Sequence, residues 1–139
     1  MKPFEIIEHT AEIGIKGYGR TVEELFEHMA EGMFSLIVPP EEVRLKESAS
    51  VEAKGEGKEL LLAAWLRELL YLFDTRKIVG RSFKIERLKE TQLLGTVSGE
   101  KLDLARHRVD KEIKAVTYCD LGIRQEADGT WSAQVIFDI

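Results

Sequence analysis

The sequence has little cysteine, few prolines and no long apolar run. A single cysteine among 139 residues excludes an internal disulfide, which agrees with a reducing compartment. The longest apolar run, residues 60–66, is far shorter than the ~20 residues that a membrane-spanning helix needs. Residues 1–5 lack the apolar stretch and cleavage site of a secretory signal. We therefore expect a cytoplasmic protein with no membrane contact.

Motifs for nucleotide binding, zinc binding and nucleophilic catalysis are also missing. The sequence contains no Gly-x-Gly-x-x-Gly pattern, Walker loop, Cys-x-x-Cys or His-Glu-x-x-His. Gly17 and Gly19 lack the rest of a phosphate-binding loop, and we interpret them as turn residues. No Ser-His-Asp or Cys-His arrangement can be assembled with any specificity. These absences favour a protein that is not an enzyme.

A basic face is not evident from the charge pattern. The formal net charge of -5 argues against a protein whose main affinity is for a phosphate backbone. Lysines and arginines gather in residues 81–89 and 106–114, but Glu86, Glu90 and Asp110 lie within or beside these groups. We interpret both groups as solvated surface charge, and we place His107 on the surface with them.

Two helices are predicted. Thr21 followed by Glu24 forms a capping box, in which each side chain satisfies a backbone donor at the start of a helix. The apolar positions between residues 22 and 37 form a stripe wide enough to cover a sheet, and the proline pair at 39–40 ends it. Residues 58–75 carry too many apolar positions for a narrow stripe, which indicates a largely buried second helix.

The remaining chain is predicted to form mainly antiparallel strands. Strands are expected on both sides of a polar corner at residues 9–10, and alternation of apolar and polar residues indicates further strands at 43–53, 82–89, 92–98, 112–119, 121–125 and 130–138. An Asp-Gly pair at 128–129 is a strong hairpin signal between the last two. The sequence predicts a single domain over residues 1–139. Its class is α+β, a two-layer sandwich of predominantly antiparallel sheet with two main helices.

Three oxygen donors are candidates for a cation site. Alternation places Glu12 and Asp138 on the polar faces of their strands, away from Ile13 and Phe137. The main-chain carboxylate of Ile139, the last residue, adds a charge beside Asp138. Adjacent carboxylates repel unless a cation lies between them, although a frayed chain end is the simpler interpretation of this pair alone. If the first hairpin and the last strand share a sheet, the three groups form an oxygen cluster suited to calcium or magnesium.

Two further side chains, His9 and Cys119, could have either a structural or a chemical role. His9 lies at the corner between the first two strands, where its imidazole either bonds the local backbone, which we favour, or serves catalysis or recognition. Cys119 lies on an alternating stretch, and we interpret it as a small buried residue in preference to a nucleophile.

Five stretches of this chain resemble the archease family, in the same order and over nearly the whole length. They are HTAEIGI at 9–15, GRTVEELF at 19–26, LRELLYLFD at 66–74, KAVTY at 114–118 and VIFDI at 135–139. The resemblance implies an accessory protein of the tRNA-splicing RNA ligase. Archeases promote guanylylation and multiple turnover of that ligase, so RNA is expected to be reached only indirectly, through the ligase.

The resemblance also implies a divalent-cation site. The acidic residue of the N-terminal motif and the final two residues correspond here to Glu12, Asp138 and Ile139. The family commonly has Asp where this chain has Glu12, and the extra methylene moves the carboxylate by up to ~1.5 Å. We therefore favour calcium, whose shell is flexible, over magnesium. A second departure is Cys119, which stands where the family usually has histidine and puts any polar role of that position in doubt.

Two other functions remain as alternatives. The first is a general protein-binding or chaperone-like module whose acidic residues have only a structural role and which shows no metal dependence. The second is a small metal-dependent hydrolase, which would require an organised base near the cation. His9 is the sole candidate for that base.

Overall fold

The computed structural model of the chain describes residues 1–8 and 10–139. Within these ranges, two helices and a short 3-10 helix alternate with β-strands. The helices are α1 (Val22–Ile37), η1 (Pro40–Glu42) and α2 (Lys58–Arg76). The strands are β1 (Phe4–Glu8), β2 (Glu12–Gly19), β3 (Glu47–Lys54), β4 (Ile78–Leu88), β5 (Gln92–Lys101), β6 (Ala115–Val116), β7 (Gly122–Gln125) and β8 (Trp131–Asp138).

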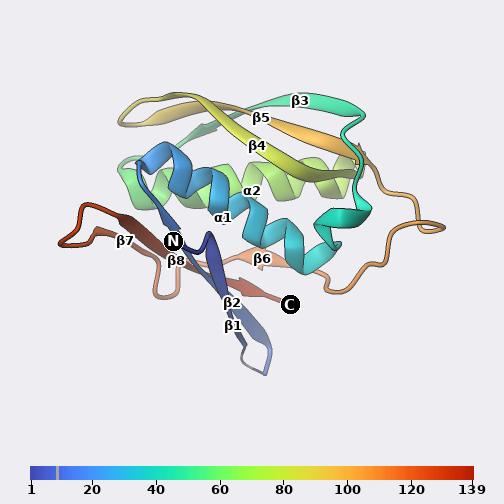
Figure 1. Cartoon of the computed structure of the whole chain (residues 1–139), viewed down its shortest axis with the longest axis horizontal. Coiled ribbons are helices and arrows are strands. Elements are labelled where there is room, and N and C mark those ends of the chain that lie inside the picture. The colour runs from blue at the N-terminus through green and yellow to red at the C-terminus, as the bar shows by residue number, and fades with distance from the viewer. Residues whose placement is uncertain (9) are drawn as a thin grey trace.

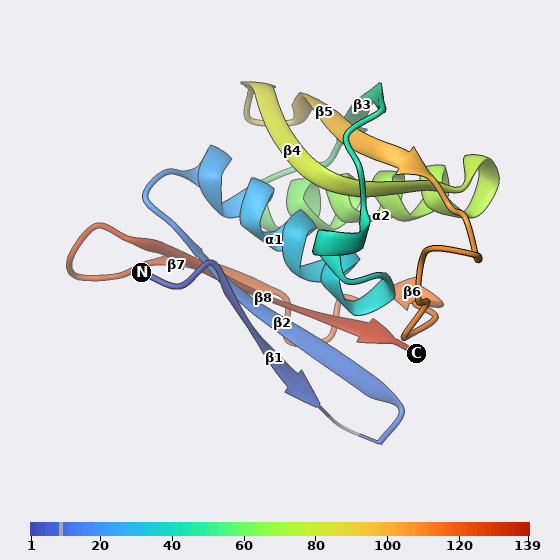
Figure 2. The same ribbon diagram turned by 45° about the vertical axis from the view of Figure 1, so that its right-hand side comes forward.

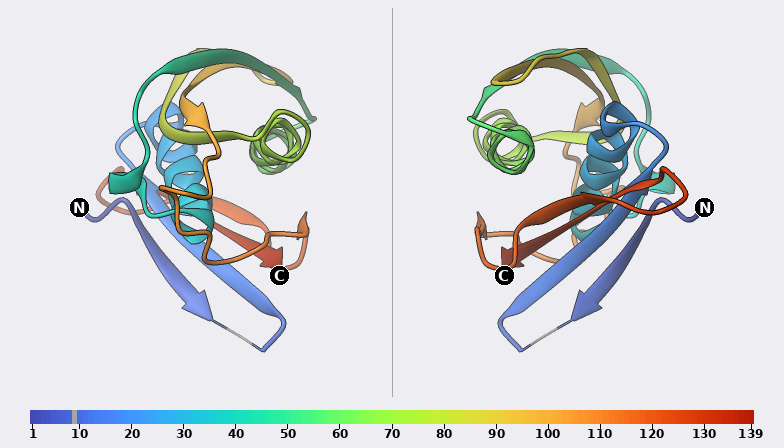
Figure 3. Two further views of the ribbon diagram at one scale, coloured as in Figure 1. Left: turned by 90° about the vertical axis from the view of Figure 1, so that its right-hand side faces the viewer. Right: turned by 90° about the vertical axis from the view of Figure 1, so that its left-hand side faces the viewer.

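The strands form two antiparallel sheets. The five-stranded sheet has the order β1-β2-β8-β6, with β7 also paired to β8, and the three-stranded sheet has the order β3-β5-β4. Figure 1 shows both helices between the three-stranded sheet above and the five-stranded sheet below, and the end-on views of Figure 3 agree. The α+β class, with antiparallel sheet and two main helices, is confirmed.

Helix α1 begins and ends as its sequence predicts. The Thr21 hydroxyl oxygen accepts a hydrogen bond from the Glu24 amide at 3.0 Å. The Glu24 carboxylate accepts from the Arg20 amide at 2.9 Å, one residue before the cap. Apolar residues of one face are fully buried between the sheets, namely Leu25, Phe26, Met29, Ala30, Met33 and Ile37. The cap therefore fixes where the helix starts, and the apolar stripe fixes which way it faces.

Helix α2 is largely buried, as its composition predicts. Leu61, Leu62, Trp65, Leu66 and Leu69 have almost no exposed surface. The indole N–H of Trp65 donates to the Phe26 carbonyl of α1 at 3.0 Å. This bond satisfies a buried donor and ties the two helices together at the centre of the core.

Gly17 and Gly19 lie within β2, so their interpretation as turn residues is wrong. Neither has a positive φ. A Cβ on Gly17 would lie 2.4 Å from the Met29 sulfur, and one on Gly19 would lie 2.4 Å from the Leu25 nitrogen. The glycines are needed because α1 packs directly against this strand.

Several strand boundaries differ from the prediction. The segment 43–53 becomes a strand only at Glu47, after η1 and an extended link. The predicted strand 112–119 shrinks to Ala115–Val116, and Cys119 beyond it is exposed rather than buried. The 128–129 hairpin is confirmed, with Gly129 at a φ of 90° between β7 and β8.

Candidate functional site

The structure brings Glu12 and Asp138 together. Strands β2 and β8 are antiparallel neighbours, and their register pairs Glu12 directly with Asp138. Residues directly opposite one another in such a pair point to the same face, with Cβ atoms about 4.5–5.5 Å apart. Ile13 and Phe137 are the next pair and face the core, so the two carboxylates lie on the outer face.

The end of β8 is held from both sides. The Ile139 amide donates to the Ala11 carbonyl at 3.3 Å, and the Ile139 side chain packs against the core. On the other side, the Lys114 amide donates to the Asp138 carbonyl at 2.8 Å. Figures 2 and 3 show the C-terminus near the first residues of β2. Asp138 and Ile139 are therefore placed by backbone pairing and not left as a frayed end.

The chemistry of these donors fits a hard cation. In residues 1–8 and 10–139, neither Glu12 nor Asp138 has an ion pair or a side-chain hydrogen bond. Like charges directly opposite in a sheet repel, and a bound cation would remove that repulsion. The same ranges hold no group of three or more His, Cys, Asp or Glu side chains that could bind a metal. The two carboxylates therefore lack a third side chain of these types in the described ranges, and the metal role of Glu12, Asp138 and Ile139 stays a prediction.

His9, the other candidate at this end of the molecule, lies outside the described residues. Its two interpretations, as a backbone-bonded corner residue or as a functional imidazole, therefore stay predictions. Cys119 has an exposed thiol.

A buried polar network at the C-terminal end of β5 was not predicted. The side chains of Glu100 and His107 are almost fully buried, so the surface position expected for His107 is wrong. The Nε2–H of His107 donates to Glu100 at 3.0 Å, and the Arg44 amide donates to the same carboxylate at 2.7 Å. Arg106 forms an ion pair with its other oxygen.

The network keeps the Glu100 carboxyl group ionised and determines which ring nitrogen of His107 carries the proton. Burial alone would raise the pKa of Glu100, but hydrogen bonds from Arg44, His107 and Arg106 outweigh it and lower the pKa from 4.5 to about 2. The His107 Nδ1 accepts from the Asp103 amide at 2.8 Å, which leaves the proton on Nε2. Arg44 and Glu100 are 56 residues apart, and no local sequence signal reveals their contact.

The segment after the network covers the end of α1. The amides of Asp110 and Lys111 donate to the carbonyls of Ile37 and Leu36 at 2.8 and 3.0 Å. These bonds satisfy carbonyls that a helix C-terminus leaves unpaired. The same segment then leads into β6, which pairs with the end of β8 at Asp138. The network therefore has a structural role, and its side chains are not part of the acidic pair.

The fold and the site define a small α+β protein with two helices enclosed by antiparallel sheets and a pair of carboxylates at one strand end. In the part of the chain that the structure describes, no helix combines the length and apolar character needed to cross a bilayer. A model of the Archease protein family (MTH1598/TM1083) matches residues 4–139. The chain belongs to the archease family.

Relatives match over all or nearly all of their length. The chain is 45% identical to the protein named "Protein archease" of Pyrococcus abyssi, with all of both chains covered. It is 40% identical to that of Methanosarcina barkeri, over 99% of this chain and 97% of the relative. The solution structure of Methanobacterium thermoautotrophicum protein 1598 superposes with a TM-score of 0.83 at 35% identity, covering all of both chains.

Proposed function

We propose that this protein activates the tRNA-splicing RNA ligase in the cytoplasm by promoting the ligase's guanylylation and multiple turnover. Membership of the archease family supports an accessory protein in tRNA processing rather than a catalyst. The observation that carries the proposal is the cross-strand pairing of Glu12 with Asp138 at the end of β8. It places two carboxylates side by side at one strand end, where a partner could contact them.

The residues of this chain have two roles in the proposed mechanism. Glu12, Asp138 and the Ile139 carboxylate would hold a divalent cation, with calcium favoured and magnesium the alternative. A bound cation supplies positive charge where two carboxylates otherwise repel. The backbone bonds of Ile139 and Lys114 keep this acidic end in place, so that it can approach the metal and nucleotide site of the ligase. RNA is reached through the ligase.

The test is ligase guanylylation and multiple turnover with Asp138→Ala. Removing one of two cross-strand carboxylates is expected to lower calcium affinity, measured by calorimetry, and ligase turnover by more than about tenfold. Asp74→Ala, an exposed position at the end of α2, is the matched control and should behave as wild type. Glu12→Asp restores the residue common in the family and should keep activation. Unchanged turnover with Asp138→Ala would overturn the proposal, and a partner-binding protein without metal dependence would then be the better reading.

A further inference from the structure

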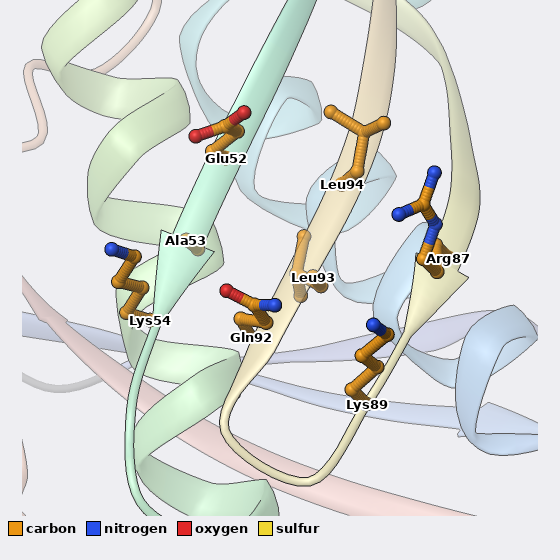
Figure 4. A pocket seen from close by; sticks show the side chains of 8 residues that line it. All are labelled: Glu52, Ala53, Lys54, Arg87, Lys89, Gln92, Leu93 and Leu94. Atoms are coloured by element: carbon orange, nitrogen blue, oxygen red, sulfur yellow. The ribbon is translucent and has the colours of Figure 1, made fainter.

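A shallow pocket lies on the outer face of the three-stranded sheet, near the turn that joins β4 to β5. It has a volume of about 180 Å³, enough for several water-sized groups. Figure 4 shows Lys54 and Lys89 on either side of Gln92, with Arg87 and Glu52 on either side of Leu94. The pocket is on the far side of the helices from the five-stranded sheet that carries Glu12 and Asp138 (Figure 1).

A β-bulge turns two of these cations outward. Phe83 and Ile85 face the core, so uninterrupted alternation would also point Arg87 inward. The register of β4 against β5 shifts between Ile85 and Arg87, and Arg87 then pairs with Leu94 on the outer face. Lys89, two residues on, follows on the same face. Bulges commonly re-aim a side chain beside a functional site.

The backbone under the pocket is held by hydrogen bonds. The Lys89 amide donates to the Gln92 carbonyl at 2.9 Å, and the Gly55 amide donates to the Thr91 carbonyl at 3.0 Å. Lys54 pairs with Gln92 in the sheet. Because adjacent strands lie about 4.8 Å apart, the Cα atoms of Lys54 and Lys89 are separated by about 10 Å across Gln92. The positions of the cations are thus set by the sheet, while their side chains stay adaptable.

The charged groups of the pocket have no partners within the protein as described. Over residues 1–8 and 10–139, the side chains of Lys54, Arg87 and Lys89 form no ion pair and no hydrogen bond, and Glu52 has none either. All four are exposed. Three cations against one carboxylate make this a locally basic site on a chain whose formal net charge is -5.

We propose that this pocket binds the phosphate backbone of single-stranded RNA. Lysine, arginine and the Gln92 amide are suited to phosphate oxygens, and Glu52 can accept a hydrogen bond from a ribose 2′-hydroxyl. Leu94 offers an apolar floor between them. No aromatic side chain lines the pocket, so binding is not based on base stacking and should be indifferent to sequence. The choice of RNA rests on the proposed function in tRNA processing, and the contact adds to the indirect one made through the ligase.

The experiment measures direct binding of the full chain to a fluorescent single-stranded RNA of about ten nucleotides by anisotropy, without the ligase. The pocket variant is Lys54→Ala with Arg87→Ala and Lys89→Ala. The control variant, Lys46→Ala with Arg76→Ala and Lys101→Ala, removes the same charge from other exposed positions. We expect the pocket variant to bind about tenfold more weakly and the control to stay within twofold of wild type. For wild type, the logarithm of affinity should fall with the logarithm of salt with a slope of about -2, as expected for three single-strand phosphate contacts.

Two further arms identify the ligand. DNA of the same sequence should bind more weakly than RNA, and Glu52→Ala should remove that difference because alanine has no acceptor for the 2′-hydroxyl, which only RNA carries. No RNA binding by wild type, an equal loss in both triple variants, or tighter binding of an acidic peptide would each overturn the inference. Because the ligase is absent, these outcomes leave the proposed activation untouched. Equally, a failure of activation in the Asp138→Ala test would leave measured RNA binding standing.

Discussion

At the scale of single residues, Glu100 determines part of the response to acid. Its pKa is lowered from 4.5 to about 2 in the folded chain, so its contribution to stability is fully present above pH 4.5 and is lost as the pH falls towards 2. Glu100→Gln should lower the free energy of unfolding by about 2–3 kcal/mol at neutral pH, because Arg106 and His107 lose a charged acceptor.

Urea unfolding at pH 7 and at pH 3 checks this prediction. Wild type should lose more stability than Glu100→Gln between the two values, since the variant has no carboxylate to protonate at this position. Other carboxylates with lowered pKa, such as Glu126 beside Arg124, titrate equally in both proteins and cancel in the difference. Glu41→Gln, at an exposed position, is the control and should change stability by less than about 0.5 kcal/mol. Parallel acid sensitivity of wild type and Glu100→Gln would contradict the assignment.

Gly99 is a second position where the surroundings determine the residue type, because they leave no room for a side chain. A Cβ there would lie 1.8 Å from the Val79 carbonyl oxygen on the neighbouring strand, which is backbone and cannot rotate away. Gly99→Ala should therefore destabilise the protein by about 2–3 kcal/mol through a forced backbone shift. Gly122→Ala, where no atom lies within 4 Å, should change stability by less than about 0.5 kcal/mol. Thermal unfolding of both variants checks the pair, and an equal effect would show that the sheet relaxes around Gly99.

Some residues of the candidate site could be predicted from the sequence and others could not. Strand alternation is a local property, and it placed Glu12 and Asp138 on outward faces that the structure then pairs. His107 lies among charged neighbours, yet it is buried and bonded to Glu100, which also accepts from the Arg44 amide 56 residues away. The sequence indicates solvated charge at Arg87 because Glu86 precedes it, and only the bulge between Ile85 and Arg87 places it on the same outer face as Lys54 and Lys89.

At the scale of elements, the helices follow from local signals more completely than the strands do. The capping box and apolar stripe of α1 act within a few residues. The stretch 112–119 alternates like a strand, but β8 is already paired with β7 over residues 131–134, which leaves its end for Ala115 and Val116. Competition for a shared partner strand is a tertiary effect that alternation alone does not show.

The N-cap of α1 gives a prediction at this scale. Thr21→Ala removes the hydroxyl that accepts from the Glu24 amide and should lower the free energy of unfolding by about 1 kcal/mol. Thr21→Ser keeps an acceptor at the same position and should cost less than half as much. Chemical denaturation of the two variants measures the difference. Equal losses would indicate that the β-branched methyl, not the cap, is what the site requires.

At the scale of the whole molecule, the assignment of strands to two sheets could not be obtained from the sequence. Strand β2 near the start of the chain pairs with β8 at its end, and α1 contacts both β2 and β4. Trp65, Phe26 and Phe137 lie together in one buried cluster with residues from both sheets. Because the core is shared in this way, neither sheet can bury its apolar face without the helices.

This shared core predicts that residues 1–139 unfold as a single domain. The two tryptophans report on different layers, since Trp65 lies in α2 at the centre of the core and Trp131 lies in β8 of the five-stranded sheet. Trp65→Phe and Trp131→Phe each leave one reporter. Within each variant, the urea transition measured by fluorescence should coincide with that measured by circular dichroism, as two-state unfolding requires.

The comparison is made within each variant because Trp65→Phe also removes the hydrogen bond to the Phe26 carbonyl. That loss should lower the free energy of unfolding of Trp65→Phe by about 1–3 kcal/mol and so lower its urea midpoint. Its fluorescence and circular dichroism transitions should still coincide. Trp131 is only partly buried, so its replacement should shift the midpoint less. A Trp131 signal that changes at lower urea than the circular dichroism would mean that the five-stranded sheet opens by itself. The acidic pair on β2 and β8 would then belong to an independently unfolding unit, and the single-domain prediction would be wrong.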